Sequence, residues 1–201
     1  MGGSKTITVG VLTDESGPAA SEFGTAMNGV KAGVGVAATE GYKIKYVVAD
    51  SATTTTGALS GAQKMVEQDH VFAVIGLSAL TFSSAPYLTS KGIPVVGAAF
   101  DSTEWLSPKS YNMFSVIGNQ DFTKVYTTTG QFLKSQGVTI LGSLGYSASP
   151  SSAASARSAA ASAQNQGLKA GYVNDSFPFG STNVAPVALA MQSAGRDCRR
   201  H

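Results

Sequence analysis

Cysteine, histidine and arginine are scarce in this sequence of 201 residues, and the few that occur gather near its C-terminal end. The single cysteine is Cys198, so no disulfide framework is possible within the chain. His70 is the only histidine outside the last six residues, and its place after a predicted helix is typical of a solvated helix-end cation. We therefore expect no metal site, no Ser-His nucleophile pair and no cofactor, and we predict that the protein is not an enzyme.

Charged residues are also few, at 13% of the chain, and their distribution excludes a nucleic-acid partner. The formal net charge is +2, and residues 196–201 alone contribute three positive side chains and one negative side chain. The preceding residues are therefore balanced, whereas binding to a phosphate backbone requires a basic face. Long apolar runs are missing as well, so we predict no membrane span and no leader sequence. The opening residues, MGGSK, fit a mature protein whose leader has been removed and equally a natural start.

What the sequence does contain is an alternation of short β-branched runs with longer stretches of helical period. Strands are predicted at residues 7–12, 44–48, 71–75, 93–96 and 113–117, and helices at 23–40, 56–70 and 83–90. The pattern restarts with helices at 122–136, 151–166 and 184–194 and strands at 138–141 and 168–173. We predict the α/β class, with a first lobe at residues 5–118, a partial second lobe at 119–195, and parallel sheets flanked by helices.

Two segments of the second lobe have an unusual composition. Residues 147–163 are rich in Ser and Ala; alanines at helical spacing predict a helix with a polar serine face, and a flexible linker is the alternative. The last helix is predicted to end at Gly195, which would serve as a glycine cap. We interpret residues 196–201, RDCRRH, as a non-native tail left by truncation or a reading-frame change, with a short basic terminus as the equal alternative.

Candidate binding residues follow the third and fourth predicted strands. Ligands of open parallel sheets bind beyond the carboxyl ends of the strands. There the sequence places small residues and hydroxyls, from Ser78 to Thr81 and from Ala98 to Phe100. The backbone amides of the helix that begins after Thr81 favour an anion such as a carboxylate. The alternative is that Thr81 and Ser83 serve only as helix N-caps.

Two further patterns are interpreted as non-catalytic. Asp14 and Glu15, at the end of the first strand, fit solvated carboxylates better than an acid/base pair. The run from Gly33 to Ala38 imitates a dinucleotide-binding fingerprint, but it lies inside a predicted helix rather than at a strand-to-helix turn. We therefore expect no nucleotide site.

Four stretches of the sequence occur in the same order as similar stretches in a known protein family. They are ITVGVLTDESGPAASEFG, EGYKIKYVVADSATTTTGALSGAQKMVEQDHVFAVIG, APYLTSKGIPVVGAAF and VTILGSLGYSASPSSAA. Over residues 5–195 the chain resembles the extracellular solute-binding proteins of ABC transporters, in the branched-chain amino-acid (Leu/Ile/Val-binding) family with the type I periplasmic-binding fold. The resemblance implies two Rossmann-like lobes with three hinge crossings, the first at residues 117–121, and an incomplete second lobe. Uncovered apolar surface would then favour a homo-oligomer or strand-exchanged dimer, and the chain would bind its ligand poorly.

The resemblance assigns ligand contacts to three loops and one aromatic position. These are Ser78, Ala79, Leu80 and Thr81; Ala98, Ala99 and Phe100; Phe23; and, from the second lobe, Tyr146 and Ser149. In the family the first two loops bind the ligand carboxylate, and either Ser78 or Thr81 is the key hydroxyl here. Phe100 stands where threonine is common, and Pro150 about where a tyrosine is common. These departures favour an apolar or aromatic carboxylate over an amino acid.

The function implied by the resemblance is the capture of a small organic solute between two lobes, without chemical change, and its delivery to an ABC permease in the membrane. The solute would be a branched-chain or other amino acid, or an apolar or aromatic carboxylate. The implied location is periplasmic or extracellular, and a lipid anchor is compatible with it. The alternative is the ligand-sensing domain of a receptor or regulator with the same fold. A small α/β enzyme is disfavoured because the sequence offers no nucleophile with a base.

Overall fold

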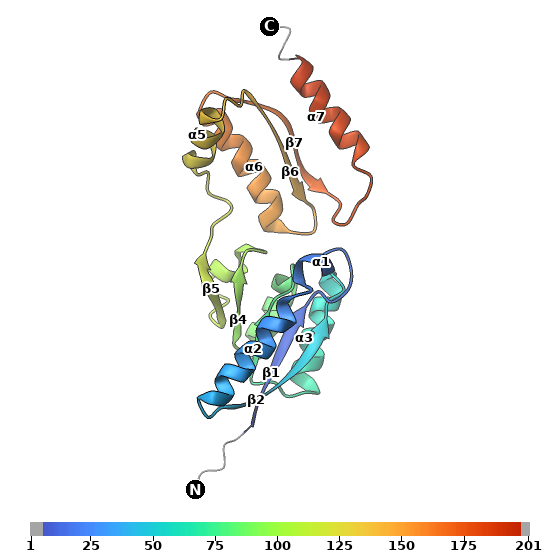
Figure 1. Cartoon of the computed structure of the whole chain (residues 1–201), viewed down its shortest axis with the longest axis vertical. Helices are drawn as coiled ribbons and strands as arrows, with labels where there is room; N and C mark the ends of the chain where they lie inside the picture. Colours follow the sequence, from blue (N-terminus) through green and yellow to red (C-terminus); the bar gives the residue numbers. More distant parts are fainter. Residues whose placement is uncertain (1–5, 198–201) are drawn as a thin grey trace. The chain divides into compact units, whose positions relative to one another are not determined.

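The structure is a computed structural model that describes residues 6–197. The chain divides into two compact units, the first ending at Gln120 and the second beginning at Asp121 (Figure 1). Both units are built from parallel strands and helices. The α/β class with parallel sheets, predicted from the alternation of strand and helix patterns, is confirmed.

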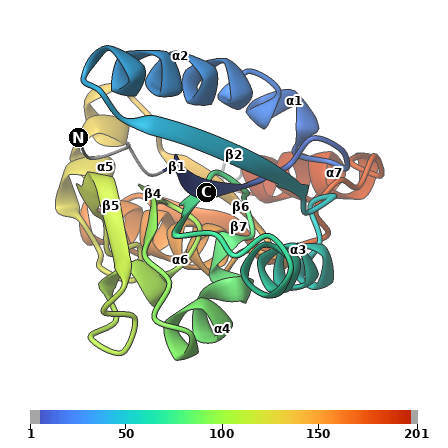
Figure 2. The same cartoon turned by 90° about the horizontal axis from the view of Figure 1, so that it is seen from below.

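The first unit holds a five-stranded parallel sheet in the order β2-β1-β3-β4-β5. Its strands are β1 (Thr6–Thr13), β2 (Lys43–Asp50), β3 (Ala73–Gly76), β4 (Val95–Ala99) and β5 (Met113–Asn119). Its helices are α1 (Ala20–Phe23), α2 (Ala26–Thr39), α3 (Thr55–Glu67) and α4 (Ala85–Ser90), with single 3-10 turns at η1 (Thr81–Ser84) and η2 (Thr103–Leu106). Helix α2 lies on one side of the sheet, and α3 and α4 lie on the other (Figure 2).

The main core lies on the side of α3 and α4. Leu12, Val74 and Val95, from three adjacent strands, are completely buried there against the small side chains of α3 and against Met65. Burial of an aliphatic side chain of this size contributes about 1.5–3 kcal/mol, so this layer fixes which face of each strand points inward.

The opposite side of the sheet is covered less completely. A groove of about 360 Å³ lies between α2 and the sheet, lined by apolar residues that include Val9, Val30 and Ile75. Further along the sheet, Val96 and Phe114 pair in register on β4 and β5, and their side chains are 39% and 54% exposed. Since register partners in a parallel sheet share a face, they form one apolar strip.

Several predicted boundaries in the first unit are wrong. The strand predicted at 93–96 is β4, Val95–Ala99, and the helix predicted at 83–90 is regular only from Ala85. The helix predicted from residue 23 is broken, because α1 ends at Phe23 and α2 begins at Ala26. Helix α3 ends at Glu67, before His70, which takes a left-handed conformation with φ of 49°. Strand β3 then begins only at residue 73, since the amide of residue 71 still donates to the carbonyl of Met65.

The second unit has a two-stranded parallel sheet of β6 (Ile140–Tyr146) and β7 (Lys169–Phe177). Helices α5 (Thr127–Ser135) and α6 (Pro150–Asn165) pack together, and α6 and α7 (Ala185–Asp197) lie on opposite sides of the sheet (Figure 1). Gly130 allows α5 to approach α6, because a Cβ at this position would stand 2.1 Å from the Ser162 carbonyl oxygen. The Gly130 amide donates to the Ser162 hydroxyl at 2.9 Å.

The Ser/Ala-rich segment forms a helix, as predicted, and the linker alternative is wrong. Ala156, Ala160 and Ala163 are buried, which agrees with their helical spacing. The serine face, however, is partly inside: Ser162 is buried and its hydroxyl donates to the Tyr126 carbonyl while it accepts from α5. Serine is small enough to sit in a tight helix contact when both its hydrogen bonds are made.

The end of the second unit corrects a further prediction. Helix α7 continues through Gly195 to Asp197, so Gly195 is not a cap. It has no positive φ, the conformation that would have ended the helix there. Of the predicted tail at residues 196–201, positions 198–201 lie outside the described residues.

Candidate functional site

The carboxyl ends of the first four strands of the five-stranded sheet meet along one edge, and three aspartates connect the loops there. Asp50 of β2 accepts hydrogen bonds from the amides of Glu15 and Ser16, which follow β1, at 3.0 and 3.2 Å. Burial opposes ionisation of Asp50, but hydrogen bonds from Ser16, Ala52 and Glu15 outweigh it and lower the pKa of this carboxyl. The loops after β1 and β2 are therefore held together.

Asp14 extends this connection to the third strand. Its carboxylate is 0% exposed and accepts hydrogen bonds from the Ser78 hydroxyl at 2.7 Å, from the Ala79 amide at 2.8 Å and from the Ser51 hydroxyl. The prediction of a solvated carboxylate is wrong for Asp14, whereas Glu15 is exposed. Asp14 has the same sequence parity as Leu12, so its side chain enters the protein, where the loops after β2 and β3 supply donors.

Asp101 makes the corresponding connection between the third and fourth strands. It is buried, and its carboxylate accepts from the Phe82 amide at 2.8 Å and from the indole nitrogen of Trp105 at 2.5 Å. Burial raises the pKa of Asp101 to about 6, and the hydrogen bonds from Trp105 and Phe82 limit the rise. The sequence analysis gives Asp101 no role; an acidic residue directly after a buried strand, four residues before the only tryptophan of the sequence, is the signal that could indicate one.

The hydroxyls of the loop after β3 point back into the protein. Those of Thr81, Ser83 and Ser84 each donate to the carbonyl three residues earlier, at 2.7–2.8 Å. The N-cap interpretation of Thr81 and Ser83 is therefore wrong, because a cap accepts a hydrogen bond from a backbone amide. Ser78, Leu80 and Thr81 are all buried.

Aromatic surface marks the same edge. The rings of Phe23, at the end of α1, and Phe100, after β4, are stacked with centroids 6.1 Å apart and planes inclined by 24°. Phe100 is 37% exposed and Phe23 is half-buried. Ala98, two residues before Phe100, is half-buried, and Ala99 is buried. Of the residues predicted on this unit, the two phenylalanines offer the largest accessible apolar side chains.

The two candidates of the second unit lie at the end of β6. Tyr146 is 38% exposed and contacts Phe179 edge-on, with ring centroids 4.7 Å apart. Ser149 is the N-cap of α6 and accepts from the Ser152 amide at 3.2 Å. The structure thus gives Ser149 a helix-capping role and Tyr146 a place in a small aromatic cluster.

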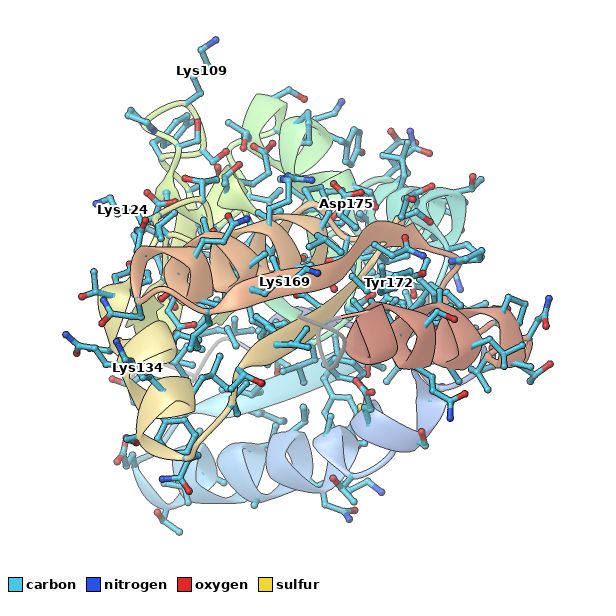
Figure 3. The ribbon with its side chains drawn as sticks, turned by 90° about the horizontal axis from the view of Figure 1, so that it is seen from above. Lys109, Lys124, Lys134, Lys169, Tyr172 and Asp175 are labelled. Carbon is cyan, nitrogen blue, oxygen red and sulfur yellow. The ribbon has the colours of Figure 1, made fainter. Side chains whose placement is uncertain are left out.

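Charged groups of the second unit are distributed along its surface. Lys169, Tyr172 and Asp175 are spaced along β7 (Figure 3), and Asp175 forms an ion pair with Arg157 of α6. Within residues 6–197, no cluster of three or more His, Cys, Asp or Glu side chains is arranged to hold a metal ion. None of the helices over the same residues combines the length and apolar character needed to cross a bilayer.

A known protein family matches almost all of this sequence. A family model described as periplasmic binding protein matches residues 6–198, and the chain belongs to that family. Its fold is the type I periplasmic-binding fold with two Rossmann-like lobes. None of the curated proteins matches this sequence.

Solved structures with a similar fold include several solute-binding proteins. One from R. palustris, in complex with 4-hydroxybenzoate, has 20% identity and a TM-score of 0.77, covering 95% of this chain and 52% of its own. Another from Rhodopseudomonas palustris HaA2, with p-hydroxybenzoic acid, has 21% identity, a TM-score of 0.78 and coverages of 95% and 52%. A leucine-binding protein from Thermotoga maritima MSB8 has 15% identity, a TM-score of 0.77 and coverages of 94% and 54%. The chain therefore spans about half the length of these proteins.

Proposed function

We propose that the protein captures a small organic solute, reversibly and without chemical change, for an ABC importer. Support comes from family membership and from the position of the candidate residues at the carboxyl edge of a parallel sheet, where such folds bind ligands. The proposed partner is a membrane permease, and the proposed location is periplasmic or extracellular, with or without a lipid anchor. A ligand-sensing domain of a receptor or regulator is the second candidate, because it would use the same fold.

We propose an apolar or aromatic carboxylate as the solute class, ahead of a branched-chain or other amino acid. The observation that carries this choice is the stacked, partly exposed pair of Phe23 and Phe100, which offers an aromatic surface at the edge of the sheet. A planar ring gains contact area and favourable edge or face geometry on such a surface. The hydroxybenzoate complexes of two structures with this fold are consistent with the choice.

We also propose that the polypeptide self-associates through the apolar strip of Val96 and Phe114. Exposed apolar patches of neighbouring strands are typical of interaction surfaces. A second copy presents the same strip, so a two-fold arrangement would cover both at once.

Calorimetric titration of the 201-residue protein tests the solute class. The panel contains 4-hydroxybenzoate, benzoate, leucine and glutamate at equal ionic strength, with saturation-transfer NMR to detect weak binding. We expect saturable binding of the aromatic acids, weaker binding of leucine and none of glutamate. The chain is predicted to bind its solute poorly, so the titration extends to millimolar solute. Saturable binding of glutamate alone would contradict the proposed class, and absence of binding of every panel solute at millimolar concentration would contradict solute capture by this chain.

A further inference from the structure

We infer that the Asp14 carboxyl group fills the donor cradle at the end of β3, so that a solute meets this unit with its apolar part rather than its carboxylate. Asp14 thereby acts as a positioning and specificity-determining residue. The orientation of the solute rests on the proposed function. The contact of Asp14 with the donor cradle does not, and it is tested independently. The donor cradle is defined as the Ser51 hydroxyl, the Ser78 hydroxyl and the Ala79 amide.

The donor cradle has the composition of a carboxylate site. Two hydroxyls and one backbone amide converge on the two oxygens of Asp14, which is completely removed from solvent. A buried carboxylate persists only where such donors replace its hydration. Two of the groups that the resemblance assigns to a ligand carboxylate, the Ser78 hydroxyl and the Ala79 amide, are thus already engaged by a carboxylate of the chain itself.

The following backbone amides of the loop after β3 are also engaged in hydrogen bonds, so they do not offer an alternative site for a ligand carboxylate. The Leu80 amide donates to the Ser78 hydroxyl at 3.1 Å, and the Thr81 amide to the Ser78 carbonyl at 3.2 Å. The next amide, of Phe82, donates to the second buried carboxylate, Asp101. An incoming carboxylate would have to break these bonds and approach two aspartates, which disfavours it by both desolvation and charge repulsion.

The accessible part of the same sheet edge is apolar. Phe23 and Phe100 are stacked and partly exposed, and Ala98, near the end of β4, is also partly exposed. An aromatic ring fits this surface without any demand for a charged partner. The orientation that follows is a solute whose ring lies on the phenylalanine pair and whose carboxylate is bound by groups outside residues 78–83.

The first test uses the unaltered protein. Hydrogen exchange measured by NMR should show the Ala79 amide protected at least a hundredfold relative to an unstructured peptide, and addition of acetate should not shift its resonance. Titration with 4-hydroxybenzoate should then move ring resonances of Phe23 and Phe100 but not the amide of Ala79. An unprotected Ala79 amide, or one that shifts with the same saturation curve as the rings, overturns the inference.

The second test removes the Asp14 carboxylate from the donor cradle. In Asp14→Ala, acetate should raise the thermal midpoint by several degrees over chloride at equal ionic strength, whereas the unaltered protein and the exposed-neighbour control Glu15→Ala should not respond. If Asp14→Ala folds only when acetate is present, the inference is supported equally. An equal response to acetate and chloride overturns it. If no panel solute binds the unaltered protein, solute capture fails while hydrogen exchange and acetate rescue still decide the role of Asp14.

Discussion

The Phe82 amide lies 2.8 Å from the Asp101 carboxylate, and this contact connects the loop after β3 to the loop after β4. The two loops are also those to which the sequence assigns ligand contacts. Any change in the charge of Asp101 therefore acts on both sides of the candidate site at once.

Replacement of Asp101 by asparagine should remove a pH dependence of stability. The folded-state pKa of about 6 exceeds the ordinary aspartate pKa of 3.8, so the folded protein binds more protons than the unfolded chain between about pH 4 and pH 6. Stability contributed by this group is consequently present at low pH and lost as pH rises to 6, by about 3 kcal/mol in total. Urea unfolding of both proteins at pH 4, 5, 6 and 7 measures the difference, and a constant difference across this range would contradict the prediction.

Gly130→Ala should destabilise the second unit by about 2 kcal/mol, because the added methyl group collides with the Ser162 carbonyl at the contact of α5 with α6. Gly195→Ala is the matched control. A Cβ at Gly195 meets no atom within 4 Å, and alanine in a helix is favoured over glycine by up to about 1 kcal/mol. Thermal unfolding followed by circular dichroism should show a lower midpoint for Gly130→Ala, and a higher midpoint for Gly195→Ala, than for the unaltered protein.

Phe100→Ala should weaken binding of 4-hydroxybenzoate roughly tenfold, since about 1.4 kcal/mol of stacking and apolar contact is lost. Phe132→Ala, which removes an exposed phenylalanine of α5, should leave the affinity unchanged. Calorimetric titration of both variants checks this. Equal affinities would show that the stacked pair does not contact the solute.

Phe114→Lys should reduce self-association, because it places a charge in the apolar strip that it forms with Val96. Loss of one buried phenylalanine contact costs about 2 kcal/mol, or roughly a thirtyfold rise in the dissociation constant. Val36→Lys, at an exposed position of α2, is the control. Sedimentation equilibrium of the three proteins over a range of concentrations gives the constants; a similar rise for both variants would point to a general effect of charge.

The order of strands and helices was predictable because each strand of the first unit contains a short run of apolar or β-branched residues. The run around Val74 is almost wholly apolar, which is typical of a central strand covered on both faces. The role of Asp14 was not predictable from local pattern. Its donors lie 37, 64 and 65 residues away along the chain, and the adjacent Glu15 is indeed exposed. The inward position of Ser162 was not predictable for the same reason, since its partners are Gly130 of α5 and Tyr126 just before that helix.

The two-stranded sheet of the second unit has a mechanical consequence. Over the described residues, β6 and β7 pair only with each other, and an isolated pair of strands is barely stable in water. Its cohesion depends on the flanking helices, whereas five strands of the first unit share one continuous core. Local unfolding should therefore begin around β6 and β7, and a protease added under native conditions should trim the chain from that side, leaving the first unit as the resistant fragment.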